Sequence, residues 1–334
     1  MKAVVATSAD ADDPVRCVDV TDLPLPAPGP GQTLVTVAAA SLNHHDLWTL
    51  RGAGGVAAFP HVLGCDVAGT TPDGTPVVVH ALVAEAARGG GDELLDPRRG
   101  TLSDRLGGAF AEQVVVPTAN LVPKPGQLTF AEAACMPTAW LTAFRMLFDR
   151  ADVRPGDTVL VQGAGGGVST AAIQLGAAAG LRMWVTSRSE AKREKAAAIG
   201  ADRTFASGER LPERVDAVID TVGEATWGHS VRSVRPGGTV VVAGWTTGAG
   251  PAADLSRLSL NNITVRGSAM GRRRDLESVL ALCVHHGIRP HIDGIHSFAD
   301  APKAFARLES GEVFGKVVLQ PDTPTPGPSK AFDR

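Results

Sequence analysis

The chain has 334 residues, a length that favours two domains over one. Hydrophobic residues make up 44% of the chain, enough for a large core, and the net charge of −3 gives no electrostatic reason to expect nucleic acid or a membrane as partner. The four cysteines are widely spaced and the start lacks the apolar segment of a signal peptide, so we expect a cytoplasmic protein with reduced thiols. The absence of tyrosine excludes any mechanism that needs a phenolic proton donor.

The chain divides into a β-rich part and a part in which strands and helices alternate. Short apolar strands between Pro and Gly turns are predicted at 3–6, 33–39, 76–80 and 111–117. Alternation begins at 158 and predicts a doubly wound parallel sheet, with strands at 158–162, 181–186, 216–220, 239–243 and 263–266. We therefore predict an α/β protein with three parts: a β-rich domain over 1–123 completed by about 287–320, a nucleotide-binding domain over 124–286, and a disordered tail over 321–334.

The segment 158–176 is the most informative of the chain. An apolar strand meets a glycine cluster, and an alanine-rich helical pattern follows, which is the opening of a dinucleotide-binding βαβ unit. A plain glycine-rich turn is the alternative, because the strict GxGxxG pattern fails at its last position; the strand and charged helix that follow favour the dinucleotide. The residues expected to bind the pyrophosphate are Gly163, Gly165, Gly166, Gly167 and Val168.

The end of the second predicted strand indicates which nicotinamide cofactor binds. NAD sites place an acidic residue there, about 20 residues past the glycine turn, to bind the ribose 2′-hydroxyl. This chain has no acid at that point; Ser187 and Arg188 stand there instead, with Lys192 one turn into the next helix. These side chains suit a 2′-phosphate, so we predict NADPH. The alternative is that Arg188 and Lys192 only form a solvated helix start.

Several segments carry a family resemblance: SLNHHDL at 41–47, LGCDVAG at 63–69, GAFAE at 108–112, RPGG at 235–238 and FGKVVL at 314–319. In their order and spacing the chain resembles the medium-chain dehydrogenase/reductase superfamily, in its zinc-free quinone oxidoreductase and enoyl reductase-like branch. The resemblance implies a GroES-like catalytic domain built from both chain ends, a Rossmann domain between them, and a cleft for cofactor and substrate. It also implies a homodimer formed through the sheet edge near 263–268, and further cofactor contacts at Thr142, Gly223, Gly244, Trp245, Ser268, Ala269 and Met270.

Many members of this superfamily hold a catalytic zinc, and the resemblance implies where its ligands would stand. Those positions are occupied here by Asn43, Cys65 and Thr138, so the ligand set is broken. The lobe that carries four cysteines in relatives corresponds to 83–99, which has none, and we expect a metal-free, mobile loop. The alternative is a nonstandard zinc on His44, Cys65 and Asp66, which would restore an alcohol dehydrogenase.

Without a metal, the resemblance implies hydride transfer from NADPH to a quinone or an activated C=C bond, because such acceptors are already electrophilic. We expect Asn43 to orient the substrate carbonyl and His44 or His45 to donate the proton, since imidazole is a competent general acid near neutral pH. The alternative for each histidine is a capping or surface role, and Asp46 is expected to tie the loop down. A non-catalytic NADPH-binding protein is the third hypothesis.

Overall fold

The computed structural model describes residues 1–53, 56 and 58–322. It divides into two compact units. The first comprises Met1–Thr138, Arg272–Leu280 and Ile292–Arg334, and the second comprises Ala139–Gly271 and Ala281–His291. Most of the tail predicted to be disordered, from 323 on, lies outside the described residues. The predicted domain limits at 123 and 286 stay predictions.

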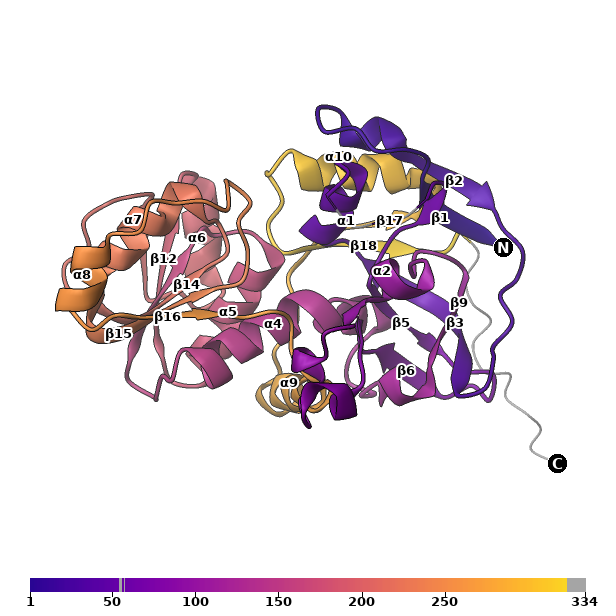
Figure 1. Ribbon diagram of the computed structural model, residues 1–334, viewed down its shortest axis with the longest axis horizontal. Coiled ribbons are helices and arrows are strands. Elements are labelled where there is room, and N and C mark those ends of the chain that lie inside the picture. The colour runs from indigo at the N-terminus through magenta and orange to yellow at the C-terminus, as the bar shows by residue number, and fades with distance from the viewer. Residues whose placement is uncertain (54–55, 57, 323–334) are drawn as a thin grey trace. The chain divides into compact units, whose positions relative to one another are not determined.

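The largest sheet of the first unit joins strands from both ends of the chain (Figure 1). The order is β10-β6-β5-β3-β18-β17, with β9 also pairing with β3, and only β17 and β18 run parallel to each other. Strand β18 pairs with β3, so residues from near the two ends of the described chain lie in one sheet. The strands are β3 (Gln32–Ser41), β5 (Asp66–Thr70), β6 (Pro76–Val79), β9 (Gln113–Pro117), β10 (Leu121–Pro123), β17 (Ile292–Ser297) and β18 (Lys316–Gln320).

Two smaller sheets and the helices α1, α2, α3 and α10 belong to the described part of the first unit. One sheet has the order β2-β1-β4 and the other pairs β7 with β8. Aliphatic side chains and phenylalanines from both chain ends share one core, in which Phe110, Phe298 and Phe305 are fully buried. The elements are β1 (Lys2–Ala6), β2 (Val18–Asp22), β4 (His61–Val62), β7 (Leu82–Val83), β8 (Gly100–Thr101), α1 (His44–Leu50), α2 (Leu102–Leu106), α3 (Phe130–Ala134) and α10 (Ala301–Glu309).

The second unit is a six-stranded parallel sheet in the order β13-β12-β11-β14-β15-β16, which is the Rossmann order. The predicted α/β fold class, a GroES-like domain with a Rossmann sheet, is confirmed. The strands are β11 (Thr158–Gln162), β12 (Arg182–Ser187), β13 (Arg203–Ala206), β14 (Val215–Asp220), β15 (Val234–Val242) and β16 (Thr264–Gly267). The helices are α4 (Leu141–Arg145), α5 (Gly167–Ala178), α6 (Glu190–Ala198), α7 (Glu224–Ser233) and α8 (Leu255–Leu260), while α9 (Arg273–His286) has residues in both units.

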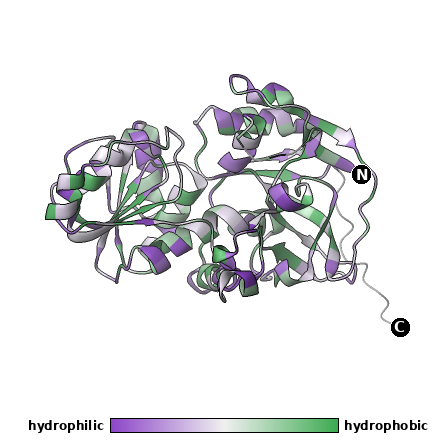
Figure 2. Cartoon of the chain, in the orientation of Figure 1, coloured by the Kyte–Doolittle hydropathy of each residue, from purple (hydrophilic) through white to green (hydrophobic). Residues whose placement is uncertain are grey.

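Hydropathy follows this layering: the central strands of the parallel sheet are apolar, and polar residues lie on the helices and loops around it (Figure 2). Leu160, Val218 and Val240 are fully buried, because helices cover both faces of a parallel sheet. In the described part of the chain, no helix combines the length and apolar character needed to cross a membrane. All four cysteines are free and buried.

Candidate active site

Helix α1 carries the two candidate histidines, and its first turn is fixed by a carboxylate. The main-chain N–H of Asn43, the residue before the helix, donates to Oδ2 of Asp46 at 2.7 Å. Asn43 is in an extended conformation, and Asp46 stands at the third helical position, so the pair forms one half of a capping box. Asp46 is completely buried. It therefore fixes the start of the helix, as expected from the sequence.

A buried polar network surrounds the Asn43 side chain. Nζ of Lys316 donates to Oδ1 of Asn43 at 2.7 Å and to the carbonyl of Leu42 at 2.6 Å. At the other end of the amide, Nδ2 of Asn43 donates to Oδ2 of Asp66 at 2.9 Å. Both ends of the amide thus already bind protein groups. The predicted role of Asn43, donation to a substrate carbonyl, stays a prediction, and the structure adds that Asn43 positions α1.

The carboxylate of Asp66 is the centre of this network. It accepts hydrogen bonds from Asn43 and Thr138, two of the residues at the superfamily's zinc-ligand positions. Oδ1 of Asp66 accepts from the Thr138 hydroxyl at 2.6 Å, and Oδ2 accepts from Ser41 at 3.2 Å besides Asn43. Lys316 lies 3.4 Å from Oδ2 and supplies the compensating charge. A neutral amide and a hydroxyl that donate to a carboxylate are not the thiolate or imidazole ligands that zinc needs. The residues at these positions therefore do not fit the catalytic zinc of the superfamily.

His45 lies between an acid and a thiol. Its Nε2 lies 3.2 Å from Oδ1 of Asp104, and its Nδ1 lies 3.8 Å from Sγ of Cys65. Burial opposes charge on the ring, but the hydrogen bonds to Asp104 and Cys65 outweigh it and raise the pKa of His45 to about 11. Burial also raises the pKa of the Cys65 thiol, against the opposing effect of His45. The ring is thus a cation at neutral pH, beside a protonated thiol.

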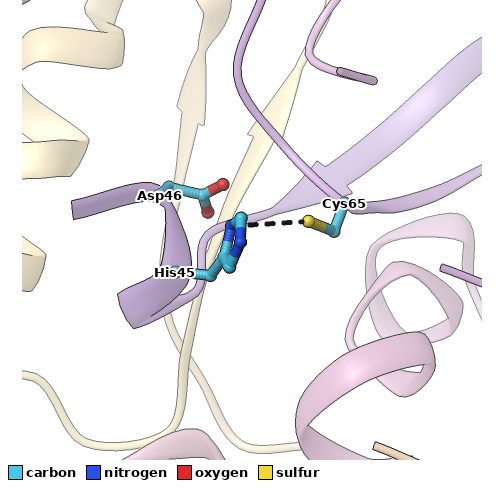
Figure 3. Close-up of side chains that lie close together, drawn as sticks. All are labelled: His45, Asp46 and Cys65. Atoms are coloured by element: carbon cyan, nitrogen blue, oxygen red, sulfur yellow. Dashed lines mark hydrogen bonds between the residues drawn. The ribbon is translucent and has the colours of Figure 1, made fainter. Parts of the chain in front are cut away.

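The alternative metal site on His44, Cys65 and Asp66 is not the group of ligands that the structure brings together. His44 is exposed, and the Asp66 carboxylate is enclosed by its four donors. The three residues that converge are instead His45, Asp46 and Cys65, whose ligand atoms all lie within 4.8 Å of one another (Figure 3). The reason is helical geometry, because consecutive residues of a helix point about 100° apart and only one of the two histidines can face Cys65.

The loop that replaces the cysteine-rich lobe is organised around a buried carboxylate, where a mobile loop was expected. Asp96 has no exposed surface and accepts from the N–H groups of Glu85 at 2.8 Å and Arg98 at 2.9 Å. The Arg88 guanidinium binds both of its oxygens. This pairing holds the pKa of Asp96 well below its usual range. An ion pair thus joins the two helical turns of the loop, Ala86–Gly89 and Glu93–Leu95.

The glycine turn lies at the carboxyl end of β11, where α5 begins. Gly165 has φ of +119°, a conformation that residues with a side chain rarely adopt, so the turn favours glycine here. Gly166 is the residue before the helix, and as a glycine it has no side chain that could accept from the first N–H groups of the helix. The first N–H groups of α5 therefore remain available for an anion. The turn is anchored from β12, where the Thr186 hydroxyl accepts from the N–H of Gly163 at 3.2 Å.

The end of β12 lies beside this turn, because β11 and β12 pair in parallel. Ser187 is buried at the strand end and Arg188 is exposed beside it. Ser189 begins α6 by accepting from the N–H of Lys192 at 3.3 Å. The guanidinium of Arg193 donates to the carbonyl of Ser187 at 2.8 Å and adds a cation that sequence reasoning missed.

The remaining predicted cofactor residues follow the carboxyl ends of the parallel strands. The exception is Thr142, which is buried on α4. Gly223 follows β14 with φ of +92°, and a Cβ there would lie 2.5 Å from the carbonyl of Gly248, so no other residue fits. Beneath it, Asp220 accepts from the N–H of Gly223 at 3.1 Å. Gly244 and the half-exposed Trp245 follow β15, and the residues that follow β16 are Ser268, Ala269 and Met270.

Sequence reasoning missed Lys316 and Asp104. A signal existed for each. Lys316 is the one charged residue in the otherwise apolar run at 316–319. Asp104 stands three residues after Thr101, in capping-box spacing, and its N–H binds the Thr101 hydroxyl at 3.2 Å. Neither signal predicts which residue the side chain binds, because the partners are distant in sequence; Lys316 lies 273 positions from Asn43.

Comparison with known proteins decides the family. Residues 29–126 match the family described as alcohol dehydrogenase GroES-like domain, and residues 167–285 match zinc-binding dehydrogenase. An acryloyl-coenzyme A reductase of Metallosphaera sedula is 32% identical over 320 residues, which cover 86% of this chain and 92% of that protein. The chain belongs to the medium-chain dehydrogenase/reductase superfamily. The predicted membership, in its enoyl-reductase-like branch, is confirmed.

Other superfamily members extend the likeness. A crotonyl-CoA reductase of Streptomyces avermitilis is 27% identical, covering 92% of this chain and 84% of that protein. Among solved structures, an NAD-dependent alcohol dehydrogenase has a TM-score of 0.89 and 34% identity, covering 96% of this chain and 99% of the other. A crotonyl-CoA carboxylase/reductase solved with NADP has a TM-score of 0.88 and 25% identity, covering 96% and 94%.

Proposed function

We propose that the chain reduces the activated C=C bond of an enoyl thioester or enone with NADPH, and that it does so without zinc. It is an NADPH-dependent oxidoreductase of the enoyl reductase type. The observation that carries the zinc independence is the engagement of Asn43 and Thr138 with the Asp66 carboxylate. Without a Lewis acid, alcohol oxidation lacks its main electrostatic aid, whereas a conjugated acceptor is already electrophilic.

The Rossmann unit supplies the cofactor site. NADPH, when bound, supplies a hydride from C4 of its nicotinamide ring. The N–H groups of Gly166, Gly167 and Val168 bind the pyrophosphate at the start of α5. Ser187, Arg188 and Lys192 bind the 2′-phosphate, since no acidic residue at the end of β12 competes for the ribose. The backbone after β14, β15 and β16 and the buried Thr142 are assigned to the nicotinamide and adenosine sides, as the family resemblance implies.

The catalytic unit supplies the proton. Hydride added to the β-carbon of the substrate leaves an enolate, and a proton must then reach the α-carbon. We assign this proton to His45, because Asp104 holds its ring as a cation and part of the ring is exposed. His44, exposed one residue earlier on the same helix, is the second candidate donor. Asn43 positions both by fixing the start of α1.

A substrate panel tests this function. NADPH oxidation is followed with crotonyl-CoA, acryloyl-CoA, simple enones, quinones and primary alcohols, before and after treatment with a strong chelator. We expect turnover with the enoyl thioesters or enones that the chelator does not lower. Turnover with quinones alone would show that the acceptor is a quinone. Oxidation of alcohols that the chelator abolishes would contradict the proposal. NADPH binding with no turnover on any acceptor would identify a non-catalytic binding protein.

The proposal extends to assembly and location. Strand β16 is the edge of the parallel sheet, and Val265 on it is 44% exposed. Helix α8, which precedes β16 in the chain, also exposes Leu255 and Leu260, and β16 pairs on one side only within the described sheet. These features support a homodimer through β16, which light scattering would detect and which Val265→Lys should weaken. The four free cysteines support a cytoplasmic location.

A further inference from the structure

His45, Asp46 and Cys65 form a cluster that zinc-independent hydride transfer does not explain. One imidazole nitrogen, one carboxylate oxygen and one thiol lie mutually within 4.8 Å, and the three side chains converge from α1 and from the chain just before β5 (Figure 3). Nδ1 of His45 and Sγ of Cys65 are 3.8 Å apart. That separation is long for a strong hydrogen bond, but two ligands of a tetrahedral zinc stand about 3.5 Å apart when their bonds are about 2.0 and 2.3 Å.

A second observation concerns Asp46. Its Oδ2 accepts from the N–H of Asn43, but its Oδ1 is buried and has no hydrogen-bond partner within the described chain. A buried carboxylate oxygen without a partner is costly, because nothing replaces the water it has lost. A cation between Oδ1, the imidazole and the thiol would remove that cost.

A third observation concerns the far side of the imidazole. Nε2 of His45 faces Oδ1 of Asp104 at 3.2 Å. Histidines that bind metals generally donate their other ring nitrogen to a carboxylate, which fixes the tautomer and orients the ring. Asp104 is itself held by the N–H of Thr101 at 3.0 Å, so the orienting group is in place before any ion arrives.

We propose that Nδ1 of His45, Oδ1 of Asp46 and Sγ of Cys65 form a binding site for a thiophilic divalent cation of the zinc type. Thiolate and imidazole favour such an ion over magnesium or calcium. The site is distinct from the superfamily's ligand positions, of which it uses only Cys65. On binding, the ion replaces the proton of the Cys65 thiol and the proton on Nδ1, and both protons pass to solvent.

Because Nε2 of His45 faces Asp104, the proton that His45 would donate is the one on Nδ1. The ion needs the same atom, so metal binding and proton donation exclude each other. Inhibition by the ion rests on the proposed function, whereas binding of the ion does not. The cation site would therefore inhibit the reductase. The two claims separate by experiment, since binding is measured on the protein alone and inhibition is measured during turnover.

Cobalt(II) is the probe, because a thiolate ligand gives it an intense near-ultraviolet charge-transfer band. Cobalt titrated into the reduced full chain should saturate at one ion per chain with that band, and zinc should displace it. Cys65→Ser should remove the band. Cys17→Ser is the matched control: Cys17 is as buried as Cys65, in the same unit, and outside the cluster, so the band should persist. Circular dichroism and NADPH binding confirm that each variant is folded.

Two further variants test the other ligands. Asp46→Asn keeps an oxygen for the Asn43 N–H but weakens the ligand, and Asp104→Asn removes the orienting carboxylate; the latter should weaken cobalt binding about 10–100-fold. A wild-type chain that shows no saturable binding, or a thiolate band that persists in Cys65→Ser, would overturn the site. In turnover, zinc should inhibit at the concentration at which it displaces cobalt, and a chelator should restore the rate. Zinc that stimulates turnover would overturn the inhibitory role and the zinc-independent function, and would leave the binding site standing.

Discussion

The ammonium of Lys316 donates to the side-chain oxygen of Asn43 at 2.7 Å, which joins the last strand of the chain to the first turn of α1. Lys316 is also the only cation that we find within ion-pair distance of the buried Asp66 carboxylate in the described part of the chain. One side chain from the end of the sequence therefore neutralises the site where relatives hold zinc and positions the helix that carries His44 and His45. Several consequences of these contacts can be measured.

Replacing Lys316 should destabilise the protein strongly. Lys316→Met leaves the Asp66 carboxylate buried without a compensating charge, and breaking one partner of a buried ion pair costs about 3–5 kcal/mol. Chemical denaturation measures the change in unfolding free energy. The control is Lys2→Met, which removes an exposed ion pair with Asp322 and should change stability by less than about 1 kcal/mol. Equal effects of the two substitutions would contradict the charge-neutralising role of Lys316.

Arg188 should control the choice of cofactor. Arg188→Ala removes a charge-assisted contact to the 2′-phosphate, so the KM for NADPH should rise about tenfold while the KM for NADH stays unchanged. Steady-state kinetics with both cofactors measure the difference. Arg182→Ala, at the other end of the same strand, is the matched control and should alter neither KM. An equal rise in the KM for NADH and the KM for NADPH would show that Arg188 does not bind the 2′-phosphate.

The pairing of His45 with Asp104 should make stability depend on pH in one direction. The pKa of His45 rises from about 6.5 when unfolded to about 11 when folded, mainly because Asp104 and Cys65 outweigh burial. A raised pKa contributes stability that is complete below about pH 6.5 and is lost as the pH rises towards about 11. Unfolding free energy should therefore fall between pH 7 and 10, and fall less in Asp104→Asn.

The comparison is best made in a Cys65→Ser background, so that thiol titration does not contribute. Identical pH profiles for the Cys65→Ser protein with and without Asp104→Asn would contradict the ion pair.

Asp96 should hold the loop that stands in place of the cysteine-rich lobe. Asp96→Asn weakens the binding of Arg88 and of the N–H groups of Glu85 and Arg98, so the segment 85–99 should exchange amide hydrogens faster and be cleaved more readily by proteases. Hydrogen-exchange mass spectrometry locates the change. Glu85→Gln removes the exposed partner of Arg88 and should have little effect. Unchanged exchange in Asp96→Asn would show that this carboxylate does not organise the loop.

The local parts of this molecule were predictable from the sequence. The glycine turn, the missing acid at the end of β12 and the loss of zinc ligands at Asn43 and Thr138 are each visible within a short segment, because strand, turn and helix signals are local. The partners of His45 were not. Its acid, Asp104, lies 59 positions away, and Cys65 was considered only together with His44, as part of an alternative metal site. Which of two adjacent histidines faces Cys65 depends on where α1 begins, and that is set by Asn43 and Asp46.

We propose that this chain transfers hydride from NADPH to an activated C=C bond without a metal, and the position of the transferred hydrogen in the product can be measured. The most direct test uses NADPH deuterated at the transferred position of C4, crotonyl-CoA as acceptor, and protein freed of metal by a chelator, with mass spectrometry and NMR of the product. We expect butyryl-CoA with one deuterium on the β-carbon, formed at a rate that metal removal does not lower. Loss of this activity on metal removal, restored by added zinc, would contradict it.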